Sequence, residues 1–178
     1  METLKIIEDK NFLSKTNKKF IKHVFSSFFP FFYHKSTDSG IKDDPYLAHI
    51  VIKRPEMRKK TEPYLNSPHY YKDVVDILNN FTRKNNITYK EILRASFNFS
   101  YANGKKTCGW HTDHDFPHWQ LIVYLNDCDK DSFTVLKENN KTINIKPAKY
   151  KGVCFTRVKH RMIFPKQKER VILVITFR

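Results

Sequence analysis

The second half of the chain is a series of short apolar segments separated by polar or Gly/Pro-containing turns, and this series limits the fold more than any other feature. In ILRASFNFSY the two kinds of side chain alternate, so Leu93, Ala95 and Phe97 share one face while Arg94 and Asn98 lie on the other. The segments that follow are QLIVYL, SFTVL, KTINIK, GVCFTRV and RVILVITF. Many short strands in series are typical of a sandwich or barrel.

The first half of the chain has a mixed character. LKIIEDK and YLAHIVIK are expected to form short strands. KKFIKHVFSSFF has apolar residues at helical spacing, and we expect a helix that starts at Ser14, continues through Phe28 and ends at Pro30. A second helix is expected in SPHYYKDVVDILNNFTRKNN, with Ser67 as N-cap and Pro68 in the first helical position. The pattern therefore predicts an α+β fold, mainly β, with an antiparallel core backed by N-terminal helices.

Length and composition favour a single folded domain. The chain has 178 residues, of which 40% are hydrophobic, which is too apolar for disorder. We expect one domain over residues 1–178, with helical support over about 1–90 and a strand-rich core over about 91–178. No apolar run approaches the roughly 20 residues of a membrane helix, and METLKIIEDKNFLS lacks the layout of a signal peptide. Three dispersed cysteines without a CxxC pair argue against disulfides or structural zinc, so we expect a cytoplasmic location.

The formal net charge of +15 has two interpretations. A basic surface gathers phosphates, which would suit a nucleic-acid partner. The alternative is codon bias, because the chain is rich in Lys, Asn and Ile and its lysines are scattered rather than massed on one helix face. Trp110, Phe116 and Trp119 could stack on a base or simply pack.

The stretch GWHTDHDFPHWQLIVYLND combines metal-ligating residue types with a strand-like apolar run. On an extended segment, His111 and Asp113 point the same way and can reach one ion. His160, close after GVCFTRV, is the candidate third ligand. Two histidines and one carboxylate form the facial triad of non-haem Fe(II) oxygenases, although a solvated loop histidine is the alternative for His111. His114 and His118 are expected to be solvated loop residues.

Arg170 is a candidate anion-binding residue. It follows His160 by ten positions and opens the strand RVILVITFR. An arginine that points into a barrel needs an anion, and a dicarboxylate would supply one through a two-pronged contact. The alternative is a surface charge at the end of KQKER.

Together these motifs resemble the 2-oxoglutarate/Fe(II)-dependent oxygenases. HxD, a distal His and an Arg ten residues later match that family from roughly Ile92 to Arg178, and the similarity is greatest to its prolyl-hydroxylase-like branch, which includes small phage and viral members. Tyr101 and Gly104 in YANGKKTCGWHTD match a Y-x-x-G segment, VYLND matches a YYLN strand, and IKPAKYKGVCFTRVKH matches a Pro…Gly…Phe…His run. The resemblance implies a double-stranded β-helix (jelly-roll) core.

The resemblance also implies roles for individual residues. It implies that His111, Asp113 and His160 bind Fe(II) and that Arg170 binds the distal carboxylate of 2-oxoglutarate, together with Tyr124 and Tyr101. Asn98 is a further candidate for cosubstrate binding, with an outward-facing strand residue as the alternative.

The sequence departs from the family pattern in two places. Asp131-Ser132-Phe133 replace the usual Gly-Gly, and Ile172 stands where a Ser or Thr often follows the arginine. Arg170 is therefore expected to lack its usual hydroxyl neighbour.

The activity that the resemblance implies is hydroxylation of a substrate C–H bond coupled to oxidative decarboxylation of 2-oxoglutarate, with Fe(II) and O₂. The favoured substrate is a prolyl or other amino-acid side chain, in a peptide or free, and no membrane partner is expected. For a viral protein the cytoplasm would be that of the host. The alternatives are an oxygenase that modifies nucleic acid or a nucleobase, and an inactive jelly-roll binding module. A zinc hydrolase is disfavoured because the chain has no HExxH.

Overall fold

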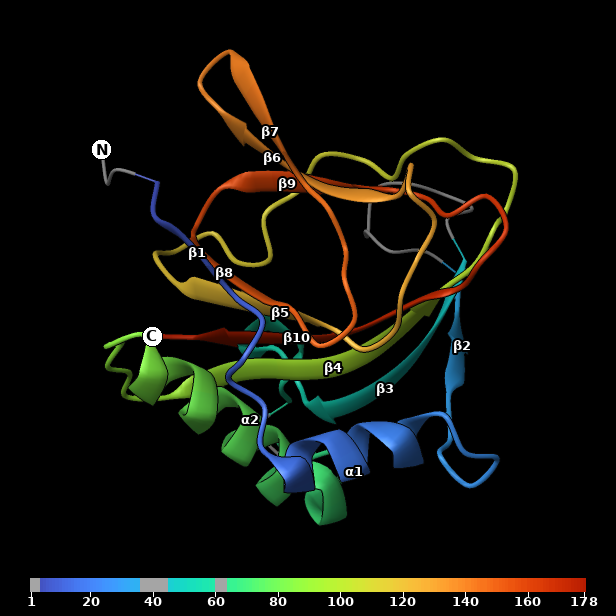
Figure 1. The fold of residues 1–178 in the computed structure, drawn as a ribbon. Coiled ribbons are helices and arrows are strands. Elements are labelled where there is room, and N and C mark those ends of the chain that lie inside the picture. The colour runs from blue at the N-terminus through green and yellow to red at the C-terminus, as the bar shows by residue number, and fades with distance from the viewer. Residues whose placement is uncertain (1–3, 36–44, 60–63) are drawn as a thin grey trace.

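The computed structural model describes residues 4–35, 45–59 and 64–178, which form two antiparallel sheets and two α-helices (Figure 1). In chain order the elements are β1 (Ile6–Asp9), α1 (Lys15–Val24), β2 (Phe32–His34), β3 (Tyr46–Ile52), the 3-10 turns η1 (Pro55–Met57) and η2 (Pro68–Tyr70), α2 (Tyr71–Lys84), β4 (Ile92–Ser100), β5 (Trp119–Tyr124), β6 (Phe133–Glu138), β7 (Lys141–Ile145), β8 (Gly152–Thr156), β9 (Lys159–Ile163) and β10 (Arg170–Phe177). The larger sheet has the order β1-β8-β5-β10-β4-β3-β2, and the smaller has the order β7-β6-β9. The expected α+β class with a mainly β core is confirmed.

Both helices cover one face of the larger sheet, on the side opposite to the smaller sheet (Figure 1). Ser14 caps α1, because its side chain accepts a hydrogen bond from the backbone N–H of Asn17, and the Asn17 side chain accepts one from the backbone of Ser14. The apolar faces of the helices share one buried core with the strands, which includes Phe20, Ile21, Val24, Val74, Leu78, Phe81, Ala95, Phe97, Leu121, Leu173 and Ile175. None of the described helices is long and apolar enough to cross a membrane.

The helix boundaries differ from the sequence expectation in two places. Helix α1 ends at Val24 and does not continue through Phe28, whose side chain is 84% exposed and has no core to pack against. Helix α2 begins at Tyr71 after the turn η2, and Ser67 does not cap it. The Ser67 hydroxyl lies 2.7 Å from Nε2 of the buried His49 on β3. Ser67 therefore hydrogen-bonds to this imidazole and not to the backbone of the helix.

The expected strands are present, and β2 and β9 are additional. His160 therefore lies within a strand of the smaller sheet, not just beyond a strand. Strands β1, β2 and β3 extend the larger sheet at its edges, so the first 90 residues supply strands as well as helices.

The inner face of the larger sheet changes character along the strands. At one end Ile122, Tyr124 and Val174 pack against Leu136 and Ile145 of the smaller sheet in a second apolar cluster. On the central strand β4 the side chains that face the same way are polar, and Arg94, Asn98 and Ser100 line a cavity between the sheets. The polar face of β4 thus faces the interior rather than bulk solvent.

Candidate metal centre

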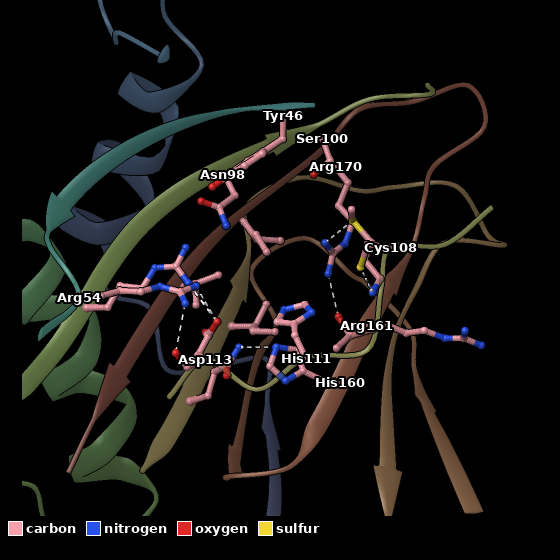
Figure 2. A pocket seen from close by; sticks show the side chains of 17 residues that line it. Tyr46, Arg54, Asn98, Ser100, Cys108, His111, Asp113, His160, Arg161 and Arg170 are labelled. Carbon is pink, nitrogen blue, oxygen red and sulfur yellow. Dashed lines mark hydrogen bonds and ion pairs between the residues drawn. The ribbon is translucent and has the colours of Figure 1, made fainter. Parts of the chain in front are cut away.

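The cavity between the sheets is lined by side chains from both of them and from the loop that precedes β5 (Figure 2). Its lining includes the charged side chains of Arg54, Arg94, Asp113, Arg161 and Arg170 and the imidazoles of His111 and His160. The three residues expected to bind metal and the arginine expected to bind an anion therefore share one cavity.

His111, Asp113 and His160 come together because two segments pair locally. The backbone N–H of His111 donates to the carbonyl oxygen of His160 (3.0 Å), and the N–H of His160 donates to that of His111 (2.8 Å). Asp113, two residues further along, reaches the same space as His111. One potential ligand atom from each of the three residues lies within 4.8 Å of the other two. The i, i+2 spacing placed His111 and Asp113 on one side of an extended segment, and His160, the candidate third ligand, lies beside them.

Hydrogen bonds set the protonation pattern of both histidines. Nδ1 of His111 lies 3.0 Å from the carbonyl oxygen of Gly109, and Nδ1 of His160 lies 3.1 Å from that of Val158. Each Nδ1 must carry a proton to donate to a carbonyl, which leaves the Nε2 lone pair free for a metal. Gln120 Nε2 lies 3.2 Å from His160 Nε2 and would turn away when an ion took that lone pair. Burial lowers the pKa of His160 to about 4, so the ring is neutral at pH 7.

The two oxygens of Asp113 have different surroundings. Oδ1 accepts hydrogen bonds from Arg54 Nη2 (2.9 Å) and Arg94 Nη1 (3.2 Å), whereas Oδ2 is buried without a partner. Burial alone would raise the pKa of Asp113, but Arg94 and Arg54 outweigh it and hold that pKa well below its usual range. A buried carboxylate oxygen without a partner is costly, and a cation would satisfy it. Two imidazole nitrogens and one carboxylate oxygen fit Fe(II) and other divalent first-row ions.

Arg170 lies at the other end of the cavity (Figure 2). Its Nη2 donates to Thr134 Oγ1 (2.7 Å), its Nη1 lies 2.9 Å from the sulfur of Met162, and its buried Nε has no partner. Within the described part of the chain, no carboxylate pairs with this guanidinium. Thr134, from β6, is the hydroxyl neighbour that the sequence at Ile172 does not provide.

The other three residues expected to bind the cosubstrate differ in their access to the cavity. Asn98 lines it, and its Oδ1 accepts a hydrogen bond from Ser96. Tyr124 is 1% exposed, and its ring lies 5.5 Å from the Arg170 guanidinium. Its hydroxyl lies 2.7 Å from Thr134 Oγ1. Tyr101 is half-buried just beyond β4. Neither tyrosine belongs to the described lining of the cavity.

His114 and His118 were expected to be solvated, and this expectation is wrong. Both are buried, at 3% and 5% exposed. His114 Nδ1 pairs with Glu56 (2.8 Å) and its Nε2 lies 2.8 Å from the Thr176 hydroxyl, while His118 Nδ1 lies 2.8 Å from the carbonyl oxygen of Phe116. These contacts fix the shape of the loop that carries His111 and Asp113.

Sequence reasoning did not identify Arg54, Arg94, Gln120 and Thr134 as parts of this site. The alternation in β4 did place Arg94 on the same face as Asn98. A polar strand face usually means solvent, and only the second sheet makes this one interior. Arg54 follows β3 without any local signal of its role.

No profile of a known protein family matches the chain, and no curated protein matches its sequence. Solved structures do match. An oxidoreductase of the 2OG-Fe(II) oxygenase family from Burkholderia pseudomallei superposes with a TM-score of 0.75 at 14% identity, over 98% of this chain and 84% of that one. A viral collagen prolyl hydroxylase from Paramecium bursaria Chlorella virus-1 gives 0.60 at 14% identity, over 97% and 95% of the two chains. A Pseudomonas putida prolyl-4-hydroxylase gives 0.60 at 12% identity, over 97% and 92%.

The chain has the fold of the 2OG-Fe(II) oxygenases. The likeness expected from the motifs is confirmed at the level of the fold. Within this 2OG-Fe(II) oxygenase fold, the His-Asp-His group and Arg170 lie in one cavity.

Proposed function

We propose that the protein is a 2-oxoglutarate- and Fe(II)-dependent dioxygenase with a double-stranded β-helix core. It would couple oxidative decarboxylation of 2-oxoglutarate to hydroxylation of a substrate C–H bond. One observation carries the proposal: three side chains whose potential ligand atoms lie within 4.8 Å of one another share a cavity with a buried arginine that pairs with no carboxylate of the described residues.

Different residues would bind the metal ion and the 2-oxoglutarate. His111 and His160 would hold the ion through Nε2 and Asp113 through Oδ2, which leaves positions on the ion for a chelating cosubstrate. Arg170 would hold the distal carboxylate of 2-oxoglutarate, with Thr134 fixing the guanidinium and Asn98 on the neighbouring strand as a further donor. Tyr124 would act through Thr134 and Arg170, since its hydroxyl lies 2.7 Å from Thr134 Oγ1 and its ring lies 5.5 Å from the Arg170 guanidinium. When bound, Fe(II) with 2-oxoglutarate and O₂ would supply the oxidising chemistry, and the apolar lining residues Ile122, Ile172 and Val174 would help to shield it.

The favoured substrate is an amino-acid side chain, free or in a peptide. Two of the similar structures are prolyl hydroxylases by name, which supports a substrate of this class. The deciding experiment is 2-oxoglutarate turnover with Fe(II), in the presence and absence of peptides, free amino acids and oligonucleotides. Succinate formation that depends on Fe(II) is the expected result.

The assignment of the metal ligands has its own test. Asp113→Ala and Asp113→Asn should each abolish divalent-ion binding and succinate formation, because Oδ2 is the one carboxylate oxygen of the group left without a partner. Asp115→Ala is the matched control, since Asp115 is an exposed carboxylate in the same loop. Circular dichroism checks that each variant folds. Wild-type ion binding by Asp113→Ala would show that the metal site lies elsewhere.

A further inference from the structure

Two arginines meet one carboxylate oxygen at the metal end of the cavity. Arg54, which follows β3, and Arg94, on β4, both donate to Asp113 Oδ1, and Arg54 also donates to the Asp113 carbonyl oxygen (3.1 Å). The Arg94 side chain is 9% exposed and that of Arg54 is 27% exposed. Arg54 lies on the other side of the two metal-site histidines from Arg170 (Figure 2).

Arg94 has hydrogen-bonding capacity to spare. A guanidinium offers five N–H donors, and Arg94 uses one nitrogen, Nη1, on Asp113. Its Nη2 and Nε make no hydrogen bond within the described part of the chain, and the Arg94 side chain lines the cavity. These donors therefore face a space in which a further acceptor can bind.

The charges around the metal do not balance without a further anion. The cavity lining carries four positive charges, on Arg54, Arg94, Arg161 and Arg170, and one negative charge, on Asp113. A divalent ion and the 2-oxoglutarate dianion would cancel each other, so an excess of three positive charges remains. Arg161 stacks on Trp110 and Arg170 would be paired with 2-oxoglutarate, so the rest of the excess lies at Arg54 and Arg94, where the nearby Glu56 carboxylate offsets only part of it. Charges held out of water without a counter-charge are costly, and this favours an anionic ligand at that end.

We propose that Arg54 and Arg94 bind a carboxylate of the substrate, which is therefore a small free acid of the amino-acid type rather than a residue inside a peptide. This inference rests on the proposed function. Arg54 and Arg94 both contact Asp113, a proposed metal ligand, so an anion bound to them would lie close to the ion. The carboxylate that they bind and the C–H bond that reacts would then belong to the same small molecule. In an internal peptide residue the α-carboxyl group is an amide and carries no charge. Planar guanidinium groups match the two oxygens of a carboxylate.

The first experiment measures binding without turnover. The protein is loaded with Zn(II) in place of Fe(II) and saturated with 2-oxoglutarate, so that the Arg170 end is filled and no oxidation occurs. The probes are acetate and the proteinogenic L-amino acids, each amino acid paired with its primary amide, which keeps the carbon skeleton and loses the carboxylate. Calorimetry should show that at least one acid binds and that its amide binds at least about tenfold more weakly, a difference of about 1.4 kcal/mol.

Variants then place the acid within the cavity. Arg54→Gln and Arg94→Gln should each weaken acid binding by at least about tenfold. Arg161→Gln is the matched control, because it removes the same charge from the same cavity but from a side chain that stacks on Trp110 at 4.3 Å. It should leave acid binding within about twofold. If Arg94→Gln fails to fold, Arg54→Gln still decides, since Arg54 is partly exposed.

Several results would overturn the proposal. These are equal binding of acid and amide, equal loss of binding in Arg161→Gln, binding of internal prolyl, aspartyl or glutamyl peptides in place of free acids, and no binding of any acid, acetate included. Acetate is also titrated into metal-free, ¹⁵N-labelled protein, and the Nε–H resonances of Arg54 and Arg94 are followed. This NMR titration needs neither metal nor 2-oxoglutarate. Failure of the proposed function would instead appear as loss of metal or 2-oxoglutarate binding in the unmodified protein.

Discussion

At the scale of single residues, Arg170 has surroundings that leave little choice about its partner. It is 3% exposed, and its contacts are a hydroxyl, a thioether and the ring of Tyr124, 5.5 Å away. None of these neutralises a guanidinium. A buried charge of this kind is retained in a folded protein when a counter-charge binds beside it.

Replacement of Arg170 by alanine should raise the apparent KM for 2-oxoglutarate by at least about tenfold, because loss of one partner of a buried charged pair costs on the order of 2–5 kcal/mol. Succinate formation at varied 2-oxoglutarate measures this. Lys166→Ala is the control, since Lys166 is 74% exposed and pairs with Asp131. An unchanged KM in Arg170→Ala would place the anion site elsewhere, with Lys166 or Lys168 as the next candidates.

His49 links stability to pH at a position remote from the metal ligands in the sequence. It is 2% exposed, with Nδ1 2.7 Å from the Pro30 carbonyl oxygen and Nε2 2.7 Å from the Ser67 hydroxyl. Burial lowers the pKa of His49 below the ordinary 6.5. The folded state therefore favours the neutral ring. Its contribution to stability is fully present above pH 6.5 and is lost as the pH falls from there through the folded-state pKa.

Urea unfolding at pH values above and below 6.5 should show this loss as a lower free energy of unfolding at the acidic pH. In His49→Gln the acid-induced loss should be smaller than in the wild type, although the variant is less stable at neutral pH. His69→Gln, which changes an exposed histidine, should keep most of the wild-type dependence, because His69 contributes less than burial to the lowered pKa of His49. An identical pH dependence in His49→Gln and wild type would refute the role of His49.

At the scale of elements, the short turn η1 and the residue before it hold the loop that carries two of the proposed metal ligands. Arg54 binds Asp113, and Glu56 binds His114 in the next position of that loop. The turn comes from the N-terminal half, and the loop precedes β5. The first half of the chain thus positions the site as well as covering the sheet.

Strand β8 and helix α2 pack so closely that their contact excludes a methyl group. A Cβ on Gly152 would lie 2.7 Å from Phe12 Cε1 and 2.8 Å from Phe81 Cε2, and both rings are buried. Gly152→Ala should therefore lower the free energy of unfolding by about 1–3 kcal/mol, as measured by urea denaturation. Phe81→Leu should cost less in the Gly152→Ala background than alone, because it removes the clashing atoms. Strictly additive effects, or a Gly152→Ala variant of wild-type stability, would contradict this packing.

The core strands could be predicted because they alternate in the sequence or are continuously apolar, and these patterns depend only on local sequence. Strand β9, KHRMI, is mostly charged and polar on one side and was missed. Its partner β6 determines that it is a strand, through pairs such as Leu136 with His160. The end of α1 was missed because Phe28 keeps the helical spacing, although no surface of the fold reaches it.

The candidate site, like the fold, was only partly predictable from local sequence. HxD, the distal histidine and the arginine ten residues later match a family signature, so the resemblance grouped His111, Asp113, His160 and Arg170 before the fold was known. Arg54 and Arg94 were not predicted, because their role depends on two strands meeting the metal loop in space. Thr134 was missed because its contact with Arg170 crosses from one sheet to the other.

At the scale of the whole molecule, the charge of +15 is carried largely outside the cavity. The described residues that line the cavity include arginines but no lysine. Lys106 lies beside Phe164, just past one end of β9, and Lys159 begins that strand at the other end. At about 3.3 Å per residue these two lysines are roughly 15 Å apart, which does not favour a single phosphate-binding cluster.

Oligonucleotides should therefore leave succinate formation unchanged, while an amino acid or peptide should stimulate it. Binding of DNA or RNA should be weak and should fall steeply with salt, because each neutralised phosphate releases counterions whether or not the surface is specific. The measurement is succinate formation with Fe(II) and 2-oxoglutarate at two salt concentrations, beside a filter-binding titration of the same oligonucleotides. Lys106 and Lys159 lie apart, and the described cations of the cavity are arginines that face a proposed metal and cosubstrate. A polyanion is therefore not expected to act on turnover. Stimulation by an oligonucleotide, but by no amino acid or peptide, would reverse this conclusion and make nucleic acid the substrate.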